Sequence, residues 1–152
     1  MSTLNGQDFV QSTSKMTEAA VLVLLQVAVT KAEELGIRAT VAVSDASGGL
    51  LGFVKMTDSF LVSSELARKK ACSAAGMGID TVELEALLAS GPPRVLSGLT
   101  ASADFTVMGG GVPLFANGDL IGGIGVSGGS EEQDIDCART AALATQLARE
   151  SK

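Results

Sequence analysis

The residues best suited to bind a ligand lie at a glycine-rich turn in the last third of the chain. An apolar segment ends in Ser127, Gly128 and Gly129, directly before a predicted helix. Free N–H groups at the start of a helix attract anions, and glycine lets a ligand approach the backbone. The turn therefore predicts a site for a carboxylate or phosphate. The alternative is a plain helix cap, because Ser130 and Gln133 form a capping-box pattern.

A second glycine-rich turn, Gly109–Gly111, follows a short apolar segment and could converge with the first turn at one end of a sheet. Lys70 is the best candidate for an inward-facing cation, because it begins a stretch of small residues at 71–75. Arg68 and Lys69 are expected on the surface. The predicted ligand-binding residues are Lys70, Gly110, Gly111, Ser127, Gly128 and Gly129.

Two acidic residues are candidates for proton transfer. Asp45 and Asp134 are the carboxylates closest to glycine-rich turns. In an enzyme, one of them would move the proton while the glycine-rich loops hold a developing oxyanion. Both are therefore the catalytic candidates of an enzymatic hypothesis.

The composition excludes several kinds of site. The chain has no His, so it has neither a Ser–His–Asp nor a Cys–His nucleophile and no His metal ligand. Its two cysteines, Cys72 and Cys137, are too far apart in sequence for a Cys-x-x-Cys zinc site, and no metal site is predicted. They indicate a reducing compartment.

Charge and hydropathy limit the classes of partner that the protein is expected to bind. The 152 residues include 11 Lys and Arg against 17 Asp and Glu, a net charge of −6, and the only aromatic residues are five Phe. Nucleic-acid binders need a basic groove and stacking side chains, so no nucleic acid is expected. The most apolar run, 19–29, is shorter than the roughly 20 residues of a membrane span. These patterns predict a cytoplasmic protein with no membrane partner.

The elements predict an α+β fold in a single domain, 16–152, after a flexible arm, 1–15. Helical patterns cover 16–35, 63–75, 81–89 and 131 to about 149. Strand patterns cover 38–44, 50–55, 104–107, 112–116 and 119–127. Hairpin signals dominate, above all Asn117-Gly118 between two apolar runs, so we expect an antiparallel sheet of about five strands flanked by helices.

Two features of these elements each leave two interpretations open. One face of the last strand carries Gly123, Gly125 and Ser127 and is nearly bare, which fits either a closely packed helix or a flat ligand. The first helix is apolar on nearly every side. It is therefore either central to its own domain or covered on its second side by a partner subunit.

The ordered motifs of the chain resemble those of the GlcG/HbpS-like family, which includes the C-terminal domain of PduO-type proteins. The matching segments span about Met16 to Leu147. They are AVSDASGGLL at 42–51, KMTDS at 55–59, ARKKA at 67–71, GGGVPL at 109–114 and IGGIGVSGG at 121–129, followed by Gln133-Asp134. Lys55 and Thr57 depart from the family pattern, which has Arg and often an acid there.

The resemblance implies a compact α+β domain that forms a homo-oligomer, and some members bind or degrade haem while others accompany corrinoid, diol or glycolate metabolism. Haem or a corrinoid is thus the implied cofactor, although the chain has no His or Tyr to ligate haem iron. Three hypotheses follow. They are a small-ligand-binding domain for such an anionic cofactor or metabolite, an enzyme acting on a small hydroxy or oxo acid, and an accessory subunit without a ligand.

Overall fold

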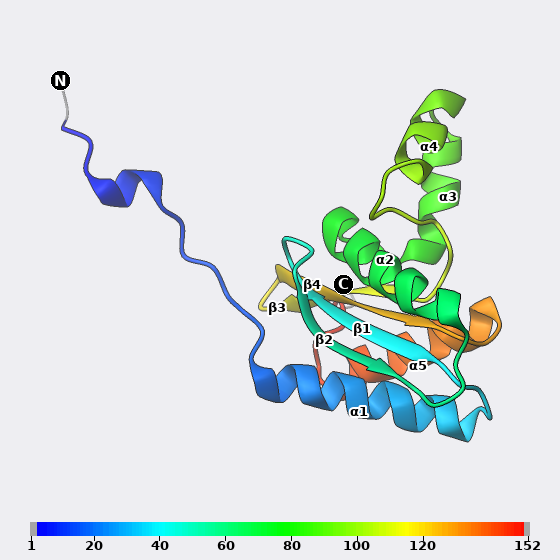
Figure 1. Cartoon of the computed structure of the whole chain (residues 1–152). Helices are drawn as coiled ribbons and strands as arrows, with labels where there is room; N and C mark the ends of the chain where they lie inside the picture. Colours follow the sequence, from blue (N-terminus) through cyan, green and yellow to red (C-terminus); the bar gives the residue numbers. More distant parts are fainter. Residues whose placement is uncertain (1–2, 151–152) are drawn as a thin grey trace.

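Four antiparallel strands form the sheet in the described part of the chain, residues 3–150 of a computed structural model (Figure 1). In chain order the strands are β1 (Thr40–Asp45), β2 (Leu50–Lys55), β3 (Gly111–Ala116) and β4 (Asp119–Ser127). Their spatial order is β2-β1-β4-β3, so β1 and β4 are central. The α+β class and the antiparallel sheet are confirmed, but the expected number of about five strands is wrong.

The segment predicted as an additional strand, 104–107, pairs with a helix side chain instead. Ser73 accepts a hydrogen bond from the backbone N–H of Thr106 at 2.9 Å and donates one to the carbonyl oxygen of Asp104 at 3.2 Å. These contacts use backbone groups that a strand would offer to a neighbouring strand. The β-like composition of this segment was therefore misleading.

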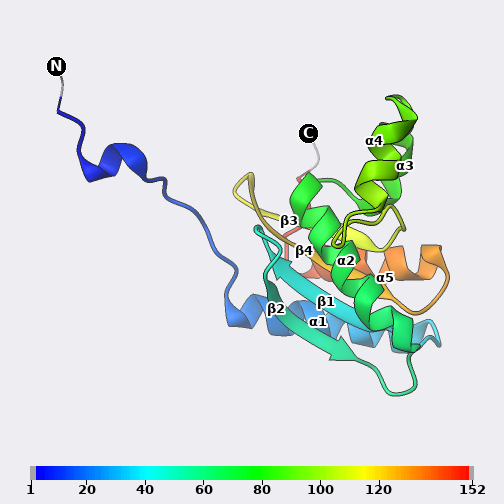
Figure 2. The same ribbon diagram turned by 45° about the horizontal axis from the view of Figure 1, so that its top comes forward.

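Helices cover both faces of the sheet. They are α1 (Glu18–Glu34), α2 (Leu61–Met77), α3 (Thr81–Ala89), α4 (Pro93–Thr100) and α5 (Glu131–Ala144), with a short 3₁₀ helix, η1 (Gly6–Phe9), near the N-terminus. Figures 1 and 2 show α2 on one face and the neighbouring α1 and α5 on the other. Helix α4 was not among the helices predicted from the sequence, and Pro93 is its first residue, a position at which proline is favoured.

Most predicted helix ends agree with the structure. Thr17 caps α1, and Ser130 forms the expected capping box with Gln133 at the start of α5. Helix α5 stops at Ala144 and not near residue 149. The chain then turns through Gln146, whose φ is 58°, and Leu147 accepts a hydrogen bond from the N–H of Phe115.

The bare face of β4 lies directly beneath α2. A Cβ atom on Gly123 would overlap the carbonyl oxygen of Ala71, and one on Gly125 would overlap that of Ala67. Only glycine therefore lets the helix backbone approach the sheet this closely. This confirms the helix-packing interpretation, and the space over these two glycines is not open to a flat ligand.

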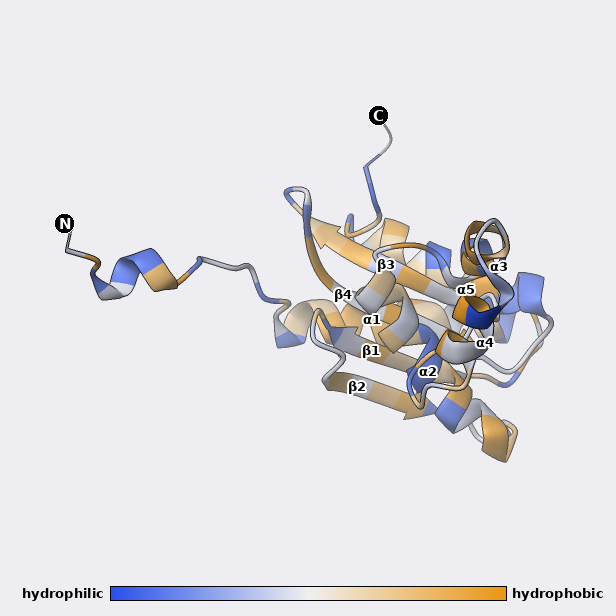
Figure 3. Cartoon of the chain, turned by 90° about the horizontal axis from the view of Figure 1, so that it is seen from above, coloured by the Kyte–Doolittle hydropathy of each residue, from blue (hydrophilic) through white to orange (hydrophobic). Residues whose placement is uncertain are grey.

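The main core lies between the other face of the sheet and the pair α1 and α5. Fully buried side chains such as Leu24, Val41 and Ile124 meet there, and Figure 3 shows how apolar the strands are. Leu22 and Val23 of α1 remain exposed on the opposite side of that helix. Within residues 3–150, no helix is both long and apolar enough to span a membrane.

The N-terminal segment runs away from the domain before α1 begins (Figure 1). Its side chains are exposed, including Phe9 and Val10, and Asn5 caps η1 locally. The flexibility expected for residues 1–15 stays a prediction, and residues 1 and 2 lie outside the described part.

Candidate functional site

Four of the six predicted ligand-binding residues line a small hollow between the first half of α2 and the β4–α5 turn, whereas Gly110 and Gly111 do not line it. The hollow has a volume of about 190 Å³. Its polar lining includes Lys70, Ser127, Gly128, Gly129 and Asp134, all of which the sequence had singled out. Strand β4 brings Ser127 to this end of the sheet, and α2 lies over it.

A buried ion pair forms the floor of the hollow. The Nζ atom of Lys70 donates to Oδ2 of Asp134 at 3.0 Å and to the carbonyl oxygen of Val126 at 2.8 Å. Lys70 is 2 % exposed and Asp134 is 3 % exposed. The inward orientation expected for Lys70 is therefore correct, while Arg68 and Lys69 pair with Asp104 and Glu65 nearer the surface.

Burial has the largest effect on the pKa of Asp134. Removal from water raises the pKa of its carboxyl group above the ordinary value. The Lys70 ammonium group and the N–H of Gly129, which donates to Oδ1 at 2.9 Å, oppose this shift. The group therefore combines a raised pKa with a position at a hollow, a combination often found at functional sites.

Three backbone amides of the two glycine-rich turns are already bonded within the protein. The N–H of Gly129 is used by Asp134, that of Gly109 by Glu131 at 3.0 Å, and that of Gly111 by Thr81 Oγ1 at 2.9 Å. A Cβ on Gly110 would come within 3.0 Å of Lys70 Nζ, so this glycine adjoins the ion pair. The two turns converge as predicted, but carboxylates of the protein occupy two of their donors.

Two serine hydroxyls in the hollow are not used by the fold. Ser63 is 2 % exposed, Ser127 is 5 % exposed, and both line the hollow. Neither hydroxyl forms a hydrogen bond within residues 3–150. Ser127 was predicted, whereas Ser63 was missed because only the tertiary structure shows which face of α2 meets the β4–α5 turn.

Apolar side chains form the rim of the hollow. They are Phe60, Val62, Leu66 and Met108, and we call them the apolar rim. Phe60 and Val62 are largely exposed, and Met108 is 45 % exposed. The run Phe60-Leu61-Val62 at the start of α2 is the sequence signal that could have found this surface, because its side chains form an exposed apolar group of the kind that marks binding surfaces.

Asp45, the other proton-transfer candidate, lies far from the hollow. It pairs with Gly122 on β4, whereas Thr40 pairs with Ser127, so five residues or about 16 Å of strand separate the two ends. Its Oδ1 accepts from the N–H groups of Ser47 and Gly49 and so closes the β1–β2 turn. The two aspartates therefore do not form a catalytic pair.

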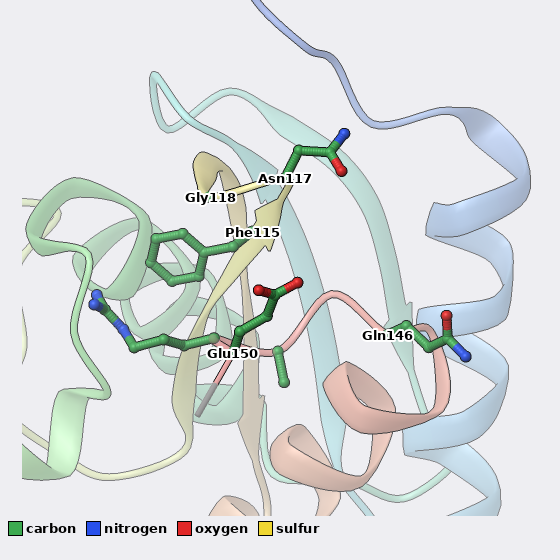
Figure 4. Close-up of a pocket in the computed structure, with 7 residues that line it drawn as sticks. Phe115, Asn117, Gly118, Gln146 and Glu150 are labelled. Atoms are coloured by element: carbon green, nitrogen blue, oxygen red, sulfur yellow. The ribbon is translucent and has the colours of Figure 1, made fainter. Parts of the chain in front are cut away.

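A larger hollow of about 650 Å³ lies between the β3–β4 turn and the C-terminal segment (Figure 4). Phe115 lines it and carries the guanidinium group of Arg149 over its ring, 4.5 Å from the ring centre. Gln146 points away from Phe115, and the hollow contains none of the predicted site residues. Its polar side chains are exposed and do not converge on one point, so we do not assign the site there.

Comparisons with known proteins agree on one family. A family profile described as "Haem degrading protein HbpS-like" matches residues 16–143. The corrinoid adenosyltransferase PduO of Citrobacter freundii is 44 % identical over 126 residues, which cover 82 % of this chain and 37 % of PduO. The chain thus spans little more than a third of that relative.

Two solved structures support the assignment. The crystal structure of a PduOC:haem complex has a TM-score of 0.82 and 35 % identity, covering 91 % of this chain and all of the other. The crystal structure of HbpS also has a TM-score of 0.82, with 30 % identity over 94 % of this chain and 98 % of the other. The chain belongs to the HbpS-like family.

Proposed function

We propose that this protein is a ligand-binding member of its family and that its ligand is a tetrapyrrole, either haem or a corrinoid. The observation that carries the proposal is the hollow around Lys70 and Asp134, where buried polar groups lie next to the exposed apolar rim. The similarity to PduO and to a PduOC:haem complex supports the ligand class.

The residues at the hollow fit a tetrapyrrole bound against the surface. The macrocycle is flat and largely apolar, and the apolar rim offers Phe60, Val62 and Leu66 for contact with its face. Met108 is the rim side chain whose sulfur could ligate haem iron, since the chain has no His or Tyr. A bound tetrapyrrole would supply a metal centre for ligand or electron chemistry.

Binding, and not adenosyl transfer, is the activity we propose. The chain corresponds to only 37 % of the adenosyltransferase PduO, so the activity of the whole relative does not follow for this chain. Asp134 is the acid in the proposed site, and its bond to Lys70 assigns it a role in holding the site together.

Titration of the purified protein with hemin and with aquocobinamide tests the proposal. We expect one saturable site per chain for at least one ligand, seen by ligand absorbance and as a rise in the thermal melting temperature. Leu66→Asp should weaken binding at least tenfold, because it places a charge against the apolar macrocycle. Leu87→Asp on α3 is the matched control, since Leu87 is exposed outside the hollow. Absence of saturable binding by both ligands contradicts the proposal.

Met108→Leu tests the role of the thioether. Leucine keeps the apolar contact and removes the sulfur, so a ligated iron would change its absorption spectrum while affinity changes little. An unchanged spectrum of the haem complex would exclude Met108 as a ligand.

We also propose that the protein forms a homo-oligomer through the surface that includes β2 and α1. Leu50, Leu51 and Phe53 are exposed on β2, an edge strand, and Leu22 and Val23 are exposed on α1. Exposed apolar groups beside an unpaired strand edge favour association. Light scattering should give a mass above 15.3 kDa, and Phe53→Glu should lower it. A monomer at all concentrations contradicts this.

A cytoplasmic location is proposed from the cysteines. Cys72 and Cys137 are both free thiols, as expected in a reducing compartment. Fractionation of cells that express the tagged chain, with a cytoplasmic marker as the control, tests the location.

A further inference from the structure

The hollow contains more hydrogen-bonding capacity than the fold uses. The hydroxyls of Ser63 and Ser127 have no partner within residues 3–150, although both residues are more than nine-tenths buried. Lys70 has three ammonium protons, and two of them bond to Val126 and Asp134. Both hydroxyls line the hollow and are open to it, so a ligand that enters can bond to them. These groups and the third ammonium proton therefore offer hydrogen bonds to a ligand in the hollow.

The charges around the hollow argue against a negatively charged partner. The Lys70 ammonium group already pairs with Asp134, and Glu131 adds a second carboxylate where it accepts from Gly109. One positive charge therefore faces two negative charges, before any ligand enters. A ligand carboxylate would add a third negative charge beside them, and its usual backbone donors at Gly109 and Gly129 are occupied.

The size of the hollow limits what enters it. About 190 Å³ is less than the roughly 300–1,000 Å³ of pockets that enclose a whole small molecule. The hollow can therefore take one substituent of a larger ligand, while the body of the ligand remains on the apolar rim.

We propose that the hollow receives an uncharged amide substituent from the edge of the ligand and discriminates against a carboxylate. The inference rests on the proposed binding of a tetrapyrrole at this site. An amide oxygen can accept from Lys70 or a serine hydroxyl, and the amide NH₂ can donate to a hydroxyl or to Glu131. Corrinoids carry primary amides around the ring, whereas haem carries two carboxylates. The hollow thus favours the corrinoid class over haem.

A matched pair of corrinoids tests this preference. Dicyanocobinamide carries amides, and dicyanocobyrinic acid has the same macrocycle with carboxylates in their place. Equilibrium dialysis at pH 7 should give at least tenfold tighter binding for the amide form. Hemin and its dimethyl ester form a second pair, in which removal of the negative charges should strengthen binding.

Serine variants connect the preference to the hollow. Ser63→Ala and Ser127→Ala should each weaken cobinamide binding about fivefold, the equivalent of one net hydrogen bond, and should leave cobyrinic acid binding unchanged. Both variants should fold with unchanged or higher melting temperatures, since neither hydroxyl bonds to the protein. Ser97→Ala, on the exposed surface of α4, is the control.

The outcomes separate this inference from the proposed function. Saturable binding in which the carboxylate form is equal or tighter overturns the amide preference but keeps tetrapyrrole binding. Binding of hemin but not of cobinamide also overturns the amide preference and keeps tetrapyrrole binding. If the preference for the amide form is unchanged in both Ser63→Ala and Ser127→Ala, the hollow is not its source. That result also overturns the inference. If neither cobinamide nor hemin binds, both proposals are wrong.

Discussion

Lys70 Nζ lies 3.0 Å from Asp134 Oδ2, and this buried ion pair connects α2 to α5 across the end of β4. The same ammonium group bonds to the carbonyl oxygen of Val126, so three elements meet at one charge. Removing one partner of a buried pair leaves an uncompensated charge in a medium that solvates it poorly. The pair therefore links the stability of the fold to the geometry of the candidate site.

Single substitutions in this pair should be costly and not additive. Lys70→Met and Asp134→Asn should each lower the free energy of unfolding by about 3–5 kcal/mol. The double variant should lose less than the sum of the two by more than 1 kcal/mol, because no lone charge remains. Urea unfolding followed by circular dichroism measures this. Lys69→Met, which breaks the partly exposed pair with Glu65, is the control and should cost about 1 kcal/mol or less. Additive losses at Lys70 and Asp134 would contradict the prediction.

The raised pKa of Asp134 predicts an unusual pH dependence. Between the ordinary value of about 3.9 and the higher value in the fold, the native state binds the proton of Asp134 more tightly than the unfolded chain does. Within that window, this group alone makes the protein less stable as the pH rises. The stability of wild type relative to Asp134→Asn should therefore fall with rising pH across the window. A rise would show that Lys70 outweighs the burial of Asp134.

Local chemistry made the hairpins and several elements predictable. Asn117 and Gly118 have φ values of 53° and 81°, as the tight turn requires, and the predicted bounds of β2, β4 and α3 agree with the structure. Strand 104–107 failed because its hydrogen bonds go to Ser73, a partner distant in sequence. Local patterns cannot show which distant groups take the backbone donors of a segment.

The candidate site, like the fold, was predictable from the sequence only in part. The small residues after Lys70 correctly indicated an inward side chain, and the two glycine-rich turns do converge. The sequence could not show that Asp134 and Glu131 would occupy the amides of these turns, because such bonds depend on the packing of α5. For the same reason Ser63 could not be identified before the position of α2 was known.

The two cysteines should react very differently with a thiol reagent. Burial raises the pKa of Cys137 to about 12, and its side chain is fully buried. Burial also raises the pKa of Cys72, but this thiol is only partly buried. Because the thiolate is the reactive form, Ellman's reagent at pH 8 should label one thiol in the native protein and two in urea. Cys72→Ser should abolish native labelling, while Cys137→Ser should preserve it. Labelling of two thiols at equal rates in the native protein would contradict this prediction.

The close contact of α2 with the sheet should make Gly125 intolerant of a side chain. A Cβ there would overlap the carbonyl oxygen of Ala67 and approach the backbone N of Ala71, so Gly125→Ala should lower the free energy of unfolding by about 1–3 kcal/mol or more. Gly98→Ala is the matched control. It lies within α4 with open space around its Cβ position, and alanine should stabilise that helix by about 0.5–1 kcal/mol. Denaturant unfolding of both variants distinguishes the two environments, and equal effects would show that α2 packs less closely on β4.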